Sequence, residues 1–195
     1  IVPLFSPVRA IPEMNQDAHL HEEKIDSEVV FEGRLLQVRR DRVRLPNGAE
    51  STREFVVHPG AVTMLALLDN GKLLLERQFR YPLGRVFLEL PAGKIDAGET
   101  AMEAARRELL EETGYVAEDW QRLGVIHNCI GYSNEFIDIY LARRLRRVSG
   151  QQLDHNEFLE VVEMSPQELG AAIRRGEVTD AKTISGLYWL EKVLA

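Results

Sequence analysis

Residues 93–115 read GKIDAGETAMEAARRELLEETGY and contain the clearest structural signals in the chain. Thr100 and Glu103 have the spacing of a helix-capping box, and Gly114 stands where a left-handed residue commonly ends a helix. The pattern therefore predicts a helix over 100–113. The loop before it, PAGKIDAGE, contains two glycines and a proline, so its backbone can approach a ligand closely.

The predicted helix carries an acidic face. On a helix that advances 100° per residue, Glu108, Glu111 and Glu112 fall within an arc of about 100°. Like charges at this spacing repel, so a positive group is expected beside them. Hard divalent ions such as Mg²⁺ prefer oxygen ligands and would suit three glutamates. The helix alone favours the alternative of a solvated acidic face with ordinary ion pairs to Arg106 and Arg107, and the preceding loop shifts the balance toward a metal site.

The segments on either side alternate in the manner of strands. Asn47-Gly48, between two alternating runs, is a strong hairpin signal. AVTMLALL (61–68) predicts a buried strand with KLLLERQFR (72–80) as its hairpin partner, and further strands are expected in 86–90, 123–130, 135–142 and 157–164. Ser165-Pro166 begins a predicted helix, and a last helix is expected over about 180–194. The mixture predicts an α+β fold.

The organisation expected from these segments has three parts. Residues 1–27 contain three prolines and a polar stretch without usable period, which indicates a tail or arm. Residues 28–58 form an N-terminal β section, and residues 59–195 form the main domain.

The composition limits location and partners. The chain has 195 residues and a formal net charge of −7, which disfavours nucleic acid as a partner. No apolar run is long enough to cross a bilayer, and the first residues lack the order of a signal peptide. The single cysteine, Cys129, cannot form an internal disulfide. We therefore expect no membrane partner and a cytoplasmic location.

The region around the helix resembles the Nudix box, Gly-x5-Glu-x7-Arg-Glu-U-x-Glu-Glu-x-Gly-U, in which U is bulky and apolar. The matching positions are Gly93, Glu99, Arg107, Glu108, Leu109, Glu111, Glu112 and Gly114. The resemblance implies an α/β/α sandwich with a mixed β-sheet. It also implies Mg²⁺-dependent hydrolysis of a nucleoside diphosphate linked to another moiety, with Mn²⁺ as a possible substitute.

The same resemblance assigns roles to the box residues. Glu108 and Glu112 would bind metal, Glu111 would assist, Arg107 would orient the glutamates, and Glu99 would support the loop and helix. A metal ion would neutralise the diphosphate and lower the pKa of an attacking water, whose proton a carboxylate base would remove.

Text outside the box is similar to the ADP-ribose pyrophosphatase branch, from about Val29 to the C-terminus. The segments LPNGAESTREFVVHPGAV, LLLERQFRYPLGRVFLELPAGKID, LDHNEFLEV and TDAKTISGLYWL carry this similarity. The branch implies a homodimer with exchanged N-terminal strands, and hydrolysis of ADP-ribose to AMP and ribose 5-phosphate.

The branch also implies further site residues. The Ala92 carbonyl would bind metal, and Glu157 would be the general base, with Glu160 as the fallback. The residues implied to bind substrate are Arg53 (reaching the partner's nucleotide), Arg80, Glu89, Gly131 and Glu135.

Two other functions remain open from the sequence. GDP-mannose or another nucleotide sugar presents the same diphosphate chemistry, and Ile130 stands where ADP-ribose enzymes commonly have a proline. A non-catalytic Nudix module that only binds a nucleotide is the second alternative. Such modules tend to lose the box glutamates, whereas all of them are present here.

Overall fold

The computed structural model describes residues 17–153 and 155–194, so residues 1–16 of the expected arm lie outside the described part. The chain divides into two units. The first contains the residues up to Val57 together with Gly131–Ser133, and the second contains His58–Ile130 and Asn134–Ala195.

The first unit is an antiparallel sheet in the order β1-β2-β3, preceded by a short 3-10 helix, η1 (Ala18–Leu20). Its strands are β1 (Glu23–Glu32), β2 (Gln37–Arg44) and β3 (Glu50–Val57). Asn47-Gly48 forms the turn between β2 and β3: Gly48 has a φ of +84°, and the Asn47 side chain accepts a hydrogen bond of 3.0 Å from the Ala49 amide. The predicted hairpin is confirmed.

The strand section begins five residues before the boundary expected at 28, within the segment expected to be a tail or arm. β1 starts at Glu23, which pairs with Arg44, and Asp26 forms an ion pair of 2.6 Å with Arg42 across the ladder. Residues 23–27 therefore belong to a strand of this sheet. Charged cross-strand pairs hold this end of β1, and such pairs leave no apolar alternation in the sequence.

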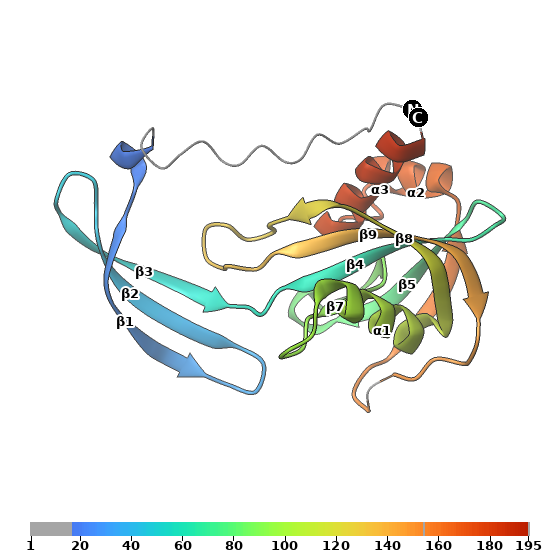
Figure 1. Cartoon of the computed structure of the whole chain (residues 1–195), viewed down its shortest axis with the longest axis horizontal. Helices are drawn as coiled ribbons and strands as arrows, with labels where there is room; N and C mark the ends of the chain where they lie inside the picture. Colours follow the sequence, from blue (N-terminus) through green and yellow to red (C-terminus); the bar gives the residue numbers. More distant parts are fainter. Residues whose placement is uncertain (1–16, 154, 195) are drawn as a thin grey trace. The chain divides into compact units, whose positions relative to one another are not determined.

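The second unit is a mixed sheet in the order β10-β5-β4-β9-β8 with three helices (Figure 1). Only the β4–β9 ladder is parallel among the ladders of the described residues. The strands are β4 (Ala61–Leu67), β5 (Leu73–Arg80), β6 (Arg85–Glu89), β7 (Ala92–Lys94), β8 (Tyr115–Ile126), β9 (Ile137–Arg147) and β10 (Leu159–Met164). A 3-10 turn, η2 (Tyr81–Leu83), precedes β6, and the helices are α1 (Ala101–Thr113), α2 (Pro166–Arg174) and α3 (Ala181–Leu194).

The sheet opens between β4 and β5. These strands pair only through Ala66–Leu67 and Leu73–Leu74, beside their tight turn. Farther along, β6 pairs with β5 and β7 pairs with β4. At the junction, the Pro91 carbonyl accepts hydrogen bonds from the Met64 amide at 2.9 Å and the Thr63 hydroxyl at 3.0 Å. The glycine-containing loop is thereby fixed at the point where the sheet divides.

Alternation along the central strands separates two apolar clusters. Met64 of β4 and Tyr140 of β9 pack in one cluster with Ala104, Ala105 and Leu109 of α1. The intervening strand residues pack in the other cluster with residues of α2 and α3: Leu65, Ile139, Leu141, Leu169, Leu187 and Leu190. Helices thus cover both faces of a mixed sheet, as expected for an α/β/α sandwich. No helix within 17–153 or 155–194 is long and apolar enough to cross a membrane.

Candidate functional site

The helix α1 begins and ends as the sequence predicts. The Glu103 amide donates to the Thr100 hydroxyl at 3.3 Å, and the Thr100 amide donates to the Glu103 carboxylate at 2.8 Å. Gly114 has a φ of +75°, and its amide donates to the Leu110 carbonyl at 2.8 Å. These two ends fix which residues α1 turns toward the loop before it.

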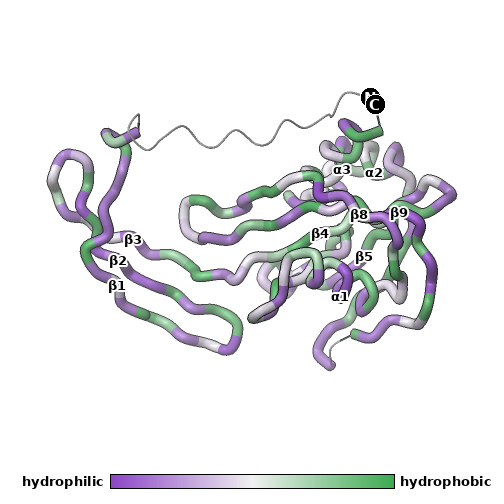
Figure 2. Tube along the Cα trace, viewed as in Figure 1, coloured by the Kyte–Doolittle hydropathy of each residue, from purple (hydrophilic) through white to green (hydrophobic). Residues whose placement is uncertain are grey.

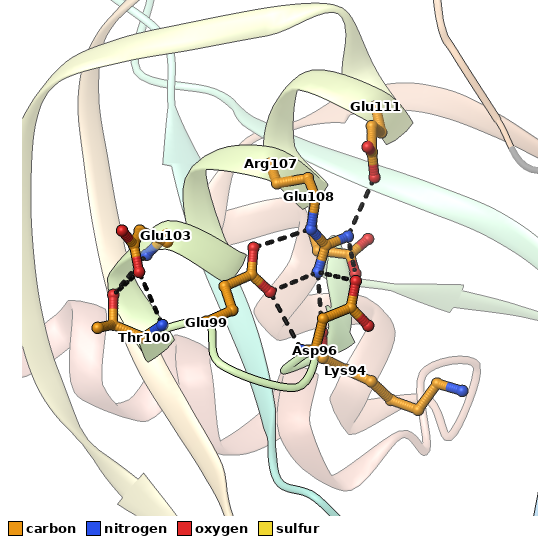
Figure 3. Close-up of polar contacts among 8 residues, drawn as sticks. All are labelled: Lys94, Asp96, Glu99, Thr100, Glu103, Arg107, Glu108 and Glu111. Atoms are coloured by element: carbon orange, nitrogen blue, oxygen red, sulfur yellow. Dashed lines mark hydrogen bonds and ion pairs between the residues drawn. The ribbon is translucent and has the colours of Figure 1, made fainter.

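Arg107 connects α1 to that loop (Figure 3). Its guanidinium donates to both Glu99 oxygens at 2.9 Å and to the Lys94 carbonyl at 3.0 Å. The remaining Nη1 donates to Glu108 at 2.8 Å and to Glu111 at 3.1 Å. The planar fork of an arginine can hold several acceptors at once, so this one side chain orders three carboxylates.

Gly93 is required by the packing of Glu108. A Cβ placed on Gly93 would lie 1.9 Å from Cδ of Glu108, a separation that no side chain tolerates. The absence of a side chain at 93 therefore lets the Glu108 carboxylate lie directly against the backbone of β7.

Glu112 lies on the same side of α1 and is buried. Its carboxylate accepts a hydrogen bond of 3.1 Å from the Ala92 amide. Burial, followed by the charges of Glu76, Glu108 and Glu157, raises the pKa of Glu112 well above its ordinary value. Burial also raises the pKa of Glu108, although Arg107 opposes the shift. Carboxylates in this state would gain from a bound cation.

Glu76 of β5 is not among the residues predicted from the sequence. Its side chain is buried at 3% exposure, and burial raises its pKa to about 8. The carboxyl group lies within hydrogen-bonding range of Glu112, and the negative charge of Glu157 contributes to raising its pKa. Alternation along the strand could have indicated it. Side chains two residues apart point to the same face, so Glu76 shares with Leu74 the face that packs against α1.

The two candidate bases lie in different surroundings. Glu157 precedes β10, interacts electrostatically with Glu108 and Glu112, and accepts a hydrogen bond of 3.4 Å from the Gln78 amide group. Glu160, the fallback, forms an ion pair of 2.6 Å with Arg77 on the neighbouring strand. The structure thus brings Glu157, rather than Glu160, to the acidic group.

Arg80 and Glu89 lie in a second polar group next to the first. Arg80 binds both Glu89 oxygens, each at 2.8 Å, and Lys182 of α3 donates to the same carboxylate. Lys182 also lies 3.1 Å from Asp180. Burial opposes ionisation of Glu89, but hydrogen bonds from Arg80 and the charge of Lys182 hold its pKa below the usual value. The sequence analysis did not identify Lys182, a lysine in an amphipathic helix with no motif around it.

A hollow of about 290 Å³ adjoins this second group. Its polar and apolar lining includes Arg80, Leu83, Phe87, Glu89, Asp180 and Lys182. The hollow therefore combines cations, carboxylates and an aromatic ring on one surface.

The remaining predicted residues have other partners or belong to the other unit. Arg53 and Gly131 are in the unit of β1–β3, where Arg53 binds Glu22 and donates to the Ser51 hydroxyl at 3.2 Å. Glu135 lies in the second unit, 3.6 Å from the His58 ring nitrogen Nε2.

The donor set fits a hard divalent cation. Glu108 and Glu112 supply carboxylate oxygens beside the backbone of β7, which carries the Ala92 carbonyl, and one oxygen of Glu76 is enclosed without a hydrogen-bond donor among the described residues. Within the described part of the chain, no three His, Cys, Asp or Glu side chains already surround a common point. Arg107 holds oxygens of both Glu108 and Glu111 in this state.

Comparison with known families matches two sequence models to the chain. The model of the NUDIX domain covers residues 57–186, which contain the site. The chain belongs to the Nudix family. A model described as the nucleoside diphosphate sugar hydrolase N-terminal domain covers residues 22–56, the strands of the first unit. Hydrolases of this family generally use divalent metal ions.

The similarity to individual relatives covers most of this Nudix hydrolase. An ADP-ribose pyrophosphatase of Bacillus subtilis is 39% identical over 88% of this chain and 94% of its own. A GDP-mannose pyrophosphatase of Yersinia enterocolitica is 33% identical over 68% of this chain and 73% of its own. A crystal structure of an ADP compounds hydrolase superposes with a TM-score of 0.80 at 26% identity, covering 90% of this chain and 95% of that one.

Proposed function

We propose that the chain hydrolyses the diphosphate of ADP-ribose to AMP and ribose 5-phosphate, with Mg²⁺ as cofactor and Mn²⁺ as a substitute. The observation that carries the proposal is the packing of Glu108 against the Gly93 backbone and of Glu112 against the Ala92 amide, with the charge of Glu157 acting on both carboxyl groups. The high identity to a relative named for ADP-ribose supports the choice of substrate.

The residues divide the chemical work. Glu108, Glu112 and the Ala92 carbonyl would hold the cation, which would supply neutralisation of phosphate charge and a lowered pKa for an attacking water. Glu157 accepts the proton of the water that attacks one phosphorus. The bond between that phosphorus and the bridging oxygen breaks, and the other phosphate leaves as a monoester. Arg107 keeps Glu99, Glu108 and Glu111 in place during the reaction.

The hollow beside Arg80 and Glu89 is the proposed place for part of the nucleotide sugar. Arg80 offers a guanidinium to phosphate oxygens, and Glu89 offers carboxylate oxygens to ribose hydroxyls. Phe87 and Leu83 give the hollow an apolar wall. We assign Arg53, Gly131 and Glu135 to substrate binding as well, on the strength of the family resemblance.

We propose further that a second copy of the chain covers the β1–β3 sheet, with exchange of the N-terminal strands. β1 contains no buried residue, and Phe31 is 55% exposed next to exposed Val29 and Val30. In Figure 2 the strands of this sheet carry strongly hydrophobic as well as hydrophilic positions. A three-stranded sheet needs cover on its apolar positions to be stable.

The dimer is tested by light scattering coupled to size-exclusion chromatography. Phe31→Glu should shift the protein toward the monomer, whereas Glu32→Gln, at the next position, should leave it dimeric. A wild-type protein that is monomeric at all concentrations contradicts this part of the proposal.

The reaction is tested by product analysis after incubation with ADP-ribose and, separately, GDP-mannose, each with and without Mg²⁺. Mg²⁺-dependent release of AMP and ribose 5-phosphate is the expected result. Turnover of GDP-mannose alone would leave the proposed mechanism in place and change the substrate. Ile130, in place of the proline common in ADP-ribose enzymes, and the similarity to the Yersinia relative would agree with that substrate. No turnover of either compound would favour a binding module.

A further inference from the structure

Glu76 is a buried ionisable residue of β5. It ends the run Leu73-Leu74-Leu75-Glu76, four consecutive buried positions of β5. Its Oε1 is fully enclosed and receives no hydrogen bond from any described residue. Burial of an ionisable group with one oxygen unpaired opposes folding, so stability alone would favour an apolar side chain at this position.

Two neighbouring carboxylates increase this cost. The charges of Glu157 and Glu89 disfavour ionisation of Glu76, whereas a hydrogen bond with Glu112 and the charge of Lys182 oppose part of the effect of burial. Glu89 stands directly opposite Glu76 in the β5–β6 ladder, where like charges repel. Lys182 itself forms its ion pairs with Glu89 and Asp180. The described residues therefore leave the Glu76 carboxylate without a positive partner of its own.

We propose that Glu76 contributes a carboxylate oxygen to the divalent-cation site formed by Glu108 and Glu112. Glu108 and Glu112 lie on α1, whereas Glu76 comes from the strand β5. Glu76 binds the cation itself or one of its waters, since Mg²⁺ usually retains several waters in proteins. The inference rests on the proposed use of a cation at this site, and it adds a residue that lies outside the Nudix box.

The test measures Mn²⁺ binding without substrate, by titration calorimetry and by the electron paramagnetic resonance signal of free Mn²⁺. Four proteins are compared: wild type, Glu76→Gln, Glu112→Gln and Glu163→Gln. Gln has nearly the volume of Glu but no charge. Glu163 lies on β10, next to β5, and is exposed beside Lys72 at 3.8 Å, so it controls for the substitution itself.

The expected result is a loss of affinity of about tenfold or more for Glu76→Gln, the range found when a supporting group of a metal site is removed. Glu163→Gln should bind as the wild type does. Without metal, Glu76→Gln should be at least as stable as the wild type, and Mn²⁺ should raise its Tm less. Glu76→Met, which fills the same space with an apolar side chain, should give the same loss of affinity.

Wild-type affinity in both Glu76 variants would overturn the inference and leave the proposed function intact. A variant that is less stable without metal but binds Mn²⁺ normally would likewise assign Glu76 a structural role. If the wild type and Glu163→Gln bind no Mn²⁺ and hydrolyse nothing, the proposed function fails, and the inference fails with it. The two failures are therefore distinguishable.

Discussion

Replacing Lys182 by methionine tests the buried polar group behind Arg80. The Lys182 side chain is 9% exposed; its ammonium group binds Glu89 and lies 3.1 Å from Asp180. Methionine keeps most of the length and volume of the side chain but removes the charge and its hydrogen bonds. Glu89 then keeps only Arg80 as a cationic partner, and Asp180 loses its contact with the ammonium group.

The expected loss of stability follows from the burial of this pair. Removing one partner of a buried ion pair costs about 3–5 kcal/mol, because the other charge stays behind. Arg80 remains on Glu89 through two hydrogen bonds of 2.8 Å, so we expect the lower end, about 3 kcal/mol. In a chain of this size, about 3 kcal/mol lowers the Tm by about 6–12 °C.

The assay is urea and thermal unfolding of the metal-free protein at about pH 8, where the carboxylate of Glu89 is ionised. Lys192→Met is the matched control, since Lys192 is an exposed lysine on the same helix, 5.2 Å from the Tyr188 ring. That change should cost at most about 1 kcal/mol. A double variant with Glu89→Gln should lose less than the sum of the two single variants, because the two side chains interact directly.

The effect of Lys182→Met should depend on pH. The native state holds the pKa of Glu89 below its ordinary value of 4.5, so the stability that Glu89 contributes is present above that pH and is lost as the pH falls through the lower, native pKa. The difference between the variant and the wild type should therefore shrink in acid. An equal difference at every pH, or a loss below about 1 kcal/mol at pH 8, would refute this account of the group.

Three further predictions concern the acidic group. Glu112→Gln should lower turnover, measured by product release, at least about 100-fold, because it removes a proposed ligand of the cation. It should not lower the urea midpoint of the metal-free protein, because the carboxyl group that it replaces is buried and has a raised pKa. Gly93→Ala should displace Glu108 and weaken Mn²⁺ binding in calorimetry; Gly150→Ala, with open space around its Cβ, should not. Mn²⁺ affinity should rise between about pH 6 and about pH 9, because the raised pKa values of Glu76 and Glu112 make protons compete with the cation. Calorimetry in buffers of different ionisation enthalpy should detect the protons that binding releases.

Local signals in the sequence predicted the elements that depend on local chemistry. The capping box at Thr100, the left-handed Gly114 and the Asn47-Gly48 turn all occur in the structure as predicted. Each depends on hydrogen bonds or backbone angles within a few residues, which a sequence displays directly.

Elements held by distant partners were missed or misplaced. β7 has three residues and exists because β4 and β5 diverge and leave room for it. β1 begins at Glu23, where the ladder to β2 is continued by charged pairs and not by apolar alternation. Neither feature has a local signature that periodicity could reveal.

The candidate site divides in the same way. The sequence by itself determined the glutamates of α1 and the loop before them, because helix spacing fixes which side chains share a face. The family resemblance pointed to Glu157, whereas only the tertiary structure decided that Glu76 joins them and that Lys182 holds Glu89. These side chains come from separate strands, a loop and a helix. Their proximity depends on how the sheet opens and how the layers pack, and the spacing of residues along the chain does not encode that.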